Sequence, residues 1–188
     1  MCRQLSELII RFSTGWVVLL ALMVFLLFTM LVLPDQAAKA EAENGDIGSP
    51  DLSFYYSAED LYRMAESYGE EGRKSYVRAR YTFDLVWPLV YTLFLITGIS
   101  WINRKVFSLG SLWQRANLVP ITGAIFDYLE NVSTSVVMVR YPAKTGVVDG
   151  IATVFTMVKW VFVTLSFVLL LIGIVVGLLV WVRSSISK

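Results

Sequence analysis

The stretch ITGAIFDYLENVSTSVVMV, residues 121–139, is long and apolar enough to cross a bilayer, yet it carries Asp127, Glu130 and Asn131 near its middle. An ionisable side chain at the centre of a bilayer costs roughly 2.5–3.5 kcal/mol on insertion scales. A helix with two such side chains is stable in a membrane only if they face other helices or a watery cavity. The rest of the chain therefore has to supply partners for them.

The composition is that of a membrane protein. Of the 188 residues, 56% are hydrophobic and 16% are charged, whereas a soluble domain averages about 25% charged residues. The net charge of +1 argues against a nucleic acid as partner. Because the chain has no histidine, we expect neither histidine-ligated haem nor a usual zinc site, and Ser-His or Cys-His catalysis is excluded.

Four apolar segments are long enough for spanning helices, which need about 20 residues. They are residues 14–33, 84–102, 117–139 and 152–182. The first segment resembles a secretory signal, but its apolar run exceeds the roughly 7–15 residues of a signal core, so we interpret it as a retained anchor. The sequence thus predicts a single-domain, all-α integral membrane protein built as a four-helix transmembrane bundle.

The polar segment 34–80 is expected on the outer side of the membrane. Residues 34–50 are rich in small, acidic and helix-breaking residues and are interpreted as a loop. Ser57 and Asp60 form an S-x-x-D cap ahead of an apolar stripe, which predicts a short amphipathic helix that ends near one of two following glycines. A second helix is expected from Arg73 into the membrane. We therefore expect a short helical extracytoplasmic cap.

Lysine and arginine in short flanking segments set the orientation of membrane helices. The segment before the first span, the loop between the second and third, and the segment after the fourth together carry one acid, Glu7. Their basic residues are Arg3, Arg11, Arg104, Lys105, Arg115, Arg183 and Lys188. Both termini are therefore expected in the cytoplasm, and the protein is expected to be a multi-pass protein of the cell membrane.

The polar residues of the third span share one face. Asp127, Glu130, Asn131 and Thr134 are spaced at i, i+3, i+4 and i+7, which places them along a single side of a helix. Membrane-embedded acids usually line a pathway or a site. We expect Asp127 and Glu130 to be catalytic, and Asn131 to bind substrate unless it only joins the helices by hydrogen bonds.

A second polar stripe leads into the second span. Tyr76, Arg80 and Asp84 are spaced at i, i+4 and i+8. Pro88, four residues further on, leaves the carbonyl oxygen of Asp84 without its helical donor. Tyr91 would extend this polar face inward. We expect these side chains to contribute to a substrate-binding cavity that opens to the outer side, although an interfacial Arg80–Asp84 ion pair and a simple packing kink at the proline are the plainer alternatives.

Two features of the fourth span bear on the site and on assembly. If the span starts immediately after Lys159, that side chain reaches the outer membrane edge, which we favour. If the helix starts about ten residues earlier, Lys159 can pair with Glu130 and contact substrate. Gly173 and Gly177 form a G-x-x-x-G pattern, which allows a homo-oligomer, although packing within the chain is the simpler explanation.

Three functions remain open from the sequence. The first is a site that binds or acts on a membrane lipid or isoprenoid-like molecule by acid–base chemistry, with one carboxyl protonated by burial and the other ionised. The second is cation- or proton-coupled transport by an oligomer, and the third is an assembly or interaction protein. If Asp127 and Glu130 serve only a function, replacing them by amides is expected to leave the fold equally or more stable.

A divalent cation is compatible with the same residues. Asp84, Asp127, Glu130 and Asn131 offer the hard oxygen ligands that magnesium and calcium prefer, but their spacing is specific for neither. No other cofactor is evident.

The predicted orientation can be tested in sealed right-side-out vesicles. Tags at either terminus should be protected from external reagents, because both ends are expected in the cytoplasm, while residues 34–80 should be cleaved by external protease. Labelling of the C-terminus from outside would contradict the four-span topology.

Overall fold

The computed structural model describes residues 2–44, 47–108 and 110–186. Lys188 of the basic set and residues 45 and 46 of the expected loop lie outside the described residues. The chain divides into two compact units. Unit 1 consists of Met1–Phe25, Val90–Gly123 and Val161–Lys188, and unit 2 of Leu26–Leu89 and Ala124–Trp160.

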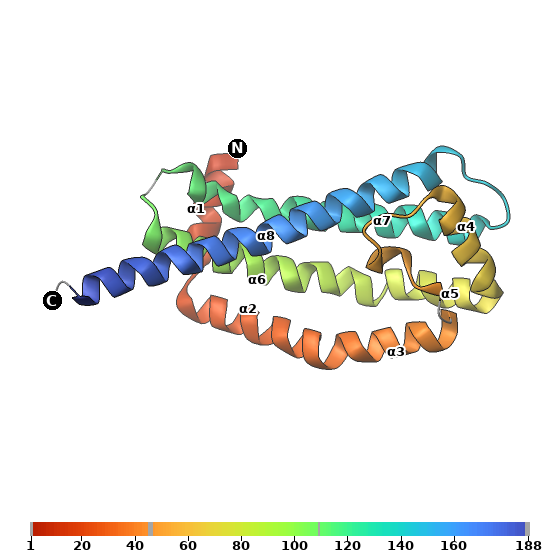
Figure 1. The fold of residues 1–188 in the computed structure, drawn as a ribbon, viewed down its shortest axis with the longest axis horizontal. Helices are drawn as coiled ribbons and strands as arrows, with labels where there is room; N and C mark the ends of the chain where they lie inside the picture. The colour runs from red at the N-terminus through yellow and green to blue at the C-terminus, as the bar shows by residue number, and fades with distance from the viewer. Residues whose placement is uncertain (1, 45–46, 109, 187–188) are drawn as a thin grey trace. The chain divides into compact units, whose positions relative to one another are not determined.

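The described residues are almost entirely helical (Figure 1). The α-helices are α1 (Cys2–Phe12), α2 (Gly15–Leu27), α3 (Leu33–Asn44), α4 (Ala58–Ser67), α5 (Gly69–Arg80), α6 (Phe83–Val106), α7 (Val119–Arg140) and α8 (Val147–Ile186). A π-helix, η1 (Phe28–Val32), joins α2 to α3, and 3₁₀ turns occupy η3 (Pro50–Leu52) and η4 (Leu112–Leu118). The all-helical class predicted from the sequence is confirmed.

Three helical stretches of the described chain are long and apolar enough to cross a membrane: Gly15–Ala42, Gly69–Val106 and Val147–Ile186. They indicate a membrane protein. The third expected span, which corresponds to α7, does not reach this apolarity because its centre carries Asp127, Glu130 and Asn131. The helix itself forms over the expected residues.

The prediction of a loop at residues 34–50 was wrong for residues 34–44, because α3 continues to Asn44. Two physical causes explain the difference. The wider π-turn of η1 ends at Val32, two residues before Pro34, and includes Met30, whose carbonyl the proline ring would otherwise approach in a regular helix. The residues that follow, AAKAEAE, are mostly alanine, lysine and glutamate, which are strong helix formers.

The predicted start of the helix after Ser57 is confirmed. The Ser57 hydroxyl accepts a hydrogen bond from the backbone N–H of Asp60, and the Asp60 carboxylate accepts one from the backbone N–H of Ser57. Gly69, the first residue of α5, has a φ of 63°. This positive φ, which glycine adopts readily, changes the chain direction between α4 and α5. The last helix, α8, begins at Val147, five residues before the expected start of the fourth span.

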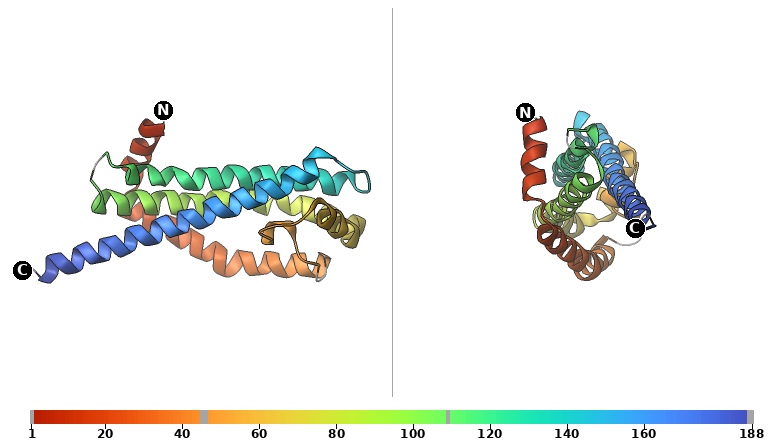
Figure 2. Two further views of the ribbon diagram at one scale, coloured as in Figure 1. Left: turned by 45° about the horizontal axis from the view of Figure 1, so that its top comes forward. Right: turned by 90° about the vertical axis from the view of Figure 1, so that its left-hand side faces the viewer.

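A polar network organises unit 1, where α1 lies beside η4 (Figures 1 and 2). The Ser6 hydroxyl of α1 donates to Asn117 Oδ1 at 2.9 Å, and Asn117 Nδ2 donates to the Ser100 hydroxyl of α6 at 2.9 Å. Nearby, Asn103 Nδ2 donates to the carbonyl oxygen of Trp113 at 2.6 Å. These buried side chains fix η4 against α1 and α6, an arrangement that the sequence analysis did not anticipate.

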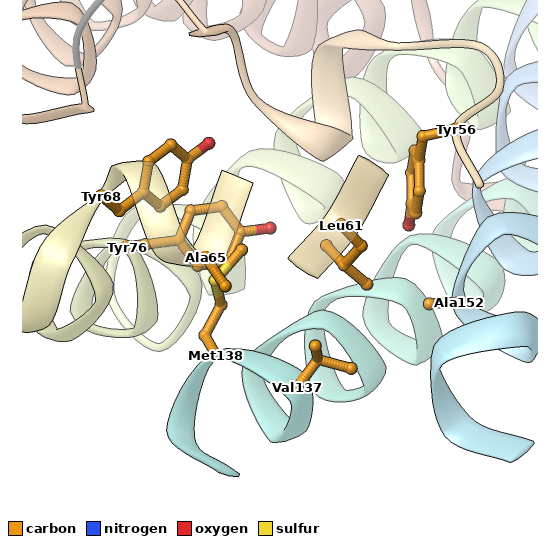
Figure 3. Packing of buried hydrophobic residues seen from close by; sticks show 8 residues of the cluster. All are labelled: Tyr56, Leu61, Ala65, Tyr68, Tyr76, Val137, Met138 and Ala152. Carbon is orange, nitrogen blue, oxygen red and sulfur yellow. The ribbon is translucent and has the colours of Figure 1, made fainter. Parts of the chain in front are cut away.

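Helix α4 contributes Leu61 and Ala65 to an apolar cluster of unit 2. Figure 3 shows Leu61 and Ala65 of α4 facing Val137 and Met138 of α7, and all four side chains are buried. Polar contacts add to this packing: the Tyr62 hydroxyl donates to Asp149 Oδ2 of α8 at 2.9 Å. Helix α4 is therefore an ordered part of unit 2.

The glycines of the G-x-x-x-G pattern are used within the chain, in unit 1. A Cβ atom built on Gly173 would lie 2.7 Å from Ile102 Cγ2, and one on Gly177 would lie 3.3 Å from Val106 Cγ2. Helix α8 thus approaches α6 closely at these positions. Homo-oligomerisation through the same glycines stays a prediction.

Gly173→Ala should lower the free energy of unfolding by about 1–3 kcal/mol, because the β-branched Ile102 cannot easily move away from the added methyl group. Denaturant titration in mixed micelles measures this. Gly150→Ala is the matched control in the same helix: its Cβ would meet no atom within 4 Å, so the substitution should raise stability by about 0.5–1 kcal/mol. Equal effects of the two substitutions would contradict the close approach.

Candidate functional site

Six charged side chains gather inside unit 2, and we call them the charge cluster. They come from η3, α5, α6, α7 and α8, and they are Asp51, Arg80, Asp84, Asp127, Glu130 and Lys159. Five of them are nine-tenths or more buried, and Asp51 is 23% exposed. Burial of so many charges is costly unless each is paired or neutralised.

The most buried members of the cluster form an ion pair. Lys159 Nζ lies 2.5 Å from Glu130 Oε2, and the two residues are 5% and 1% exposed. Helix α8 begins at Val147 and places Lys159 more than three turns inside the helix, and the favoured position of Lys159 at the membrane edge stays a prediction. The sequence alternative, a Lys159–Glu130 pair, is the arrangement found.

Arg80 joins three segments of unit 2. Its guanidinium lies 3.0 Å from Asp84 Oδ2 and 3.3 Å from Asp51 Oδ1, and its Nη1 donates to Asn131 Oδ1 at 3.5 Å. Asn131 Nδ2 in turn donates to Asp127 Oδ1 at 3.3 Å. The two polar stripes recognised in the sequence, on α5–α6 and on α7, therefore meet through Arg80 and Asn131.

Asp51 was missed by the sequence analysis. It lies in a segment interpreted as polar connection, at no helical spacing from the other members, so no signal marked it. Burial alone would raise the pKa of Asp51, but Arg80, Lys159 and the Ser49 hydroxyl together lower it below its usual value. Asp51 is therefore ionised at neutral pH and balances Arg80, while its carbonyl oxygen accepts a hydrogen bond from Lys159 Nζ at 3.3 Å.

Tyrosines border the cluster. The Arg80 guanidinium lies 4.4 Å from the ring centroid of Tyr76, a cation–π contact. The Tyr56 hydroxyl, also missed from the sequence, is 2.9 Å from Thr156 Oγ1, and burial together with the nearby Glu130 carboxylate raises the pKa of Tyr56. Tyr91 is buried but belongs to unit 1, so it is not among the residues that unit 2 brings together.

The charge cluster contains four carboxyl groups but only two cationic side chains. If every carboxyl were ionised, two negative charges would lack a cation in a buried setting, which is strongly unfavourable. In addition, Glu130 Oε1 is buried and has no hydrogen-bond partner among the described residues. The cluster is therefore suited to hold a proton on a carboxyl or to bind a group that donates a hydrogen bond.

The arrangement of the acidic side chains bears on whether this site could bind the divalent cation considered from the sequence. Within the described ranges, no three Asp, Glu or Cys side chains lie close enough together to hold a metal ion. The carboxyl groups instead face Arg80, Lys159 and Asn131.

A surface pocket of unit 2 reaches the cluster from one side. Its volume is about 320 Å³, and it lies between α3 and α5, with both Tyr76 and Arg80 in its wall. The substrate-binding role predicted for these two residues thus has a cavity beside it.

Comparison with known proteins finds no matching protein family, no matching curated protein and no matching solved structure.

Removing one partner of the Glu130–Lys159 pair should be strongly destabilising. Glu130→Gln or Lys159→Met alone should lower the free energy of unfolding by about 3–5 kcal/mol, because each leaves a buried charge without its partner. This reverses the expectation from sequence that neutralising Glu130 leaves the fold stable. SDS titration in mixed micelles measures the change.

The double variant Glu130→Gln/Lys159→Met is the control for this prediction. It should be more stable than either single variant, because an uncharged pair of similar size removes the desolvation penalty of both charges. Additive losses in the double variant would show that the two side chains do not stabilise each other.

Proposed function

We propose that this protein binds an amphiphile, a membrane lipid or isoprenoid-like molecule, and acts on it by acid–base chemistry in the charge cluster. The observation that carries the proposal is the excess of carboxyl groups over cations in a buried cluster, where Glu130 Oε1 has no hydrogen-bond donor among the residues that the structure describes. Buried ionisable groups are costly, and in membrane proteins they usually mark a site or pathway.

In the proposed architecture, α7 is the third of four membrane spans and residues 47–80 form a cap on the outer side. The acids of α7 are tolerated because Arg80 and Lys159 come from neighbouring helices of the same unit. The packing of α4 against α7 and the hydrogen bonds of Tyr56 to α8 support the cap. With both termini in the cytoplasm, the cluster would then be reached from the outer half of the membrane.

The proposed chemistry divides the carboxyl groups by their partners. Asp51 and Asp84 neutralise Arg80, and Glu130 neutralises Lys159. Asp127 accepts a hydrogen bond from the Asn131 amide, and it is the group we assign to carry the exchangeable proton. A protonated Asp127 would donate to a ligand oxygen, and Glu130 would accept a proton from the ligand, so one proton is given and one is taken.

Proton-coupled transport uses the same groups, but it requires a path that crosses the membrane. An interaction protein would use the cluster only as a bond between helices. The effect of lipid on stability distinguishes the proposed function from the interaction function. A cluster that only joins helices should not be stabilised by added lipid.

Thermal melts in detergent, with and without native lipid extract, test the proposal. The extract should raise the melting temperature of the wild type, and mass spectrometry should identify the retained lipid. Asp127→Asn and the double variant Glu130→Gln/Lys159→Met should lose this rise, because both remove proton-exchanging groups from the cluster while keeping side-chain size.

Asp149→Asn is the matched control, since Asp149 is a buried acid of the same unit that accepts a hydrogen bond from Tyr62, outside the charge cluster. It should keep the lipid-dependent rise. If lipid still raised the melting temperature of both cluster variants, the lipid would bind outside the charge cluster. If lipid did not raise the melting temperature of the wild type, the interaction function would be favoured.

A further inference from the structure

We infer that the pocket between α3 and α5 is a binding site for a phosphate group, carried by an anionic lipid. This inference deepens the proposed function by naming the headgroup of its ligand. The pocket belongs wholly to unit 2, and its wall includes Lys39 and Gln36 of α3 and Ser75, Arg78 and Arg80 of α5.

The charge of the pocket selects an anion. Three basic side chains line it, Lys39, Arg78 and Arg80, whereas none of the described residues in its wall is acidic. Lys39 pairs with Asp35 one turn away, but both side chains of this pair are exposed. Such surface ion pairs contribute little to the stability of the fold. A phosphate group can therefore compete for Lys39 at small cost.

One residue of the pocket wall, Arg80, also carries an unsatisfied donor. Arg80 is 8% exposed, and its Nε–H is buried with no hydrogen-bond acceptor among the described residues, although the rest of the guanidinium pairs with Asp51 and Asp84. A buried guanidinium N–H without an acceptor is unfavourable. Phosphate oxygens match guanidinium geometry well, and serine and glutamine side chains in the same wall supply further donors.

The surroundings favour a phosphate that carries an acyl or similar chain. The two helical stretches that frame the pocket are both apolar enough to cross a membrane. Along the first, Met30 and Leu31 lie just before Gln36 and are exposed; along the second, Leu85 and Val86 follow Thr82 of the wall and are exposed. A polar, cationic pocket next to exposed apolar helix surface suits an amphiphile better than a free ion.

Binding to phosphatidylglycerol and to inorganic phosphate, measured by thermal stabilisation of the full chain in detergent, tests the inference. Short-chain phosphatidylglycerol should stabilise the wild type, and Lys39→Ala/Arg78→Ala should weaken its binding by about tenfold or more, because two of three phosphate contacts are lost. Both residues are exposed, so the variant should fold. Arg63→Ala/Lys74→Ala is the matched control: it removes the same two residue types from exposed sites outside the pocket.

Each outcome has a distinct meaning. Equal weakening by the two double variants would overturn the site, because the effect would then be that of net charge alone. Inorganic phosphate that binds as tightly as the lipid would keep the anion site but overturn its assignment to a lipid. If Lys39→Ala/Arg78→Ala loses phosphatidylglycerol binding while Asp127→Asn leaves every lipid response intact, the pocket stands and the acid–base function fails.

Discussion

The ion pair between Lys159 and Glu130 is the constraint on which the organisation of unit 2 depends. Neither residue can be buried alone, because an uncompensated charge in a low-dielectric interior costs several kcal/mol. The 2.5 Å contact therefore fixes the register of α8 against α7. It also requires α8 to begin well before its most apolar run, so that Lys159 lies inside the helix and not at its end.

The remaining charges extend this constraint to segments that are distant in sequence. Once α7 presents Asp127 and Asn131 beside Glu130, a cation is needed on their side, and Arg80 supplies it from the end of α5. Arg80 is buried in turn and needs carboxylates, which Asp84 and Asp51 provide. The segment around η3 is thus held by electrostatics, while α4 is held by apolar packing of Leu61 and Ala65.

Helical periodicity made four of the six members of the charge cluster predictable. The i, i+3, i+4 spacing of Asp127, Glu130 and Asn131 and the i, i+4 spacing of Arg80 and Asp84 each place side chains on one helix face, whatever the tertiary structure. Asp51 could not be found this way, because it reaches the cluster from a non-periodic segment. Lys159 depended on where α8 begins, and helix ends are poorly marked by sequence.

The error at residues 34–44 has a different origin. Pro34 and the acidic composition favoured a loop, yet the alanine, lysine and glutamate residues that follow are strong helix formers. The helix propensity of these residues outweighs the helix-breaking effect of Pro34, because the π-turn at η1 accommodates the proline locally. Without this continuation of α3, Gln36 and Lys39 would not stand beside α5, and the pocket at Arg80 would lack one wall.

Arg80 connects the two proposals because its guanidinium contacts the acids of the charge cluster and also lines the pocket. Arginine keeps its charge, so it cannot relieve an added negative charge by losing a proton. A phosphate bound in the pocket would draw on the same positive charge that Asp51 and Asp84 share. The electrostatic potential at the carboxyl groups would then become more negative, and proton uptake by one of them would become more favourable. By linkage, a protonated cluster would bind the phosphate more tightly, so headgroup binding and the protonation that acid–base chemistry requires would reinforce each other.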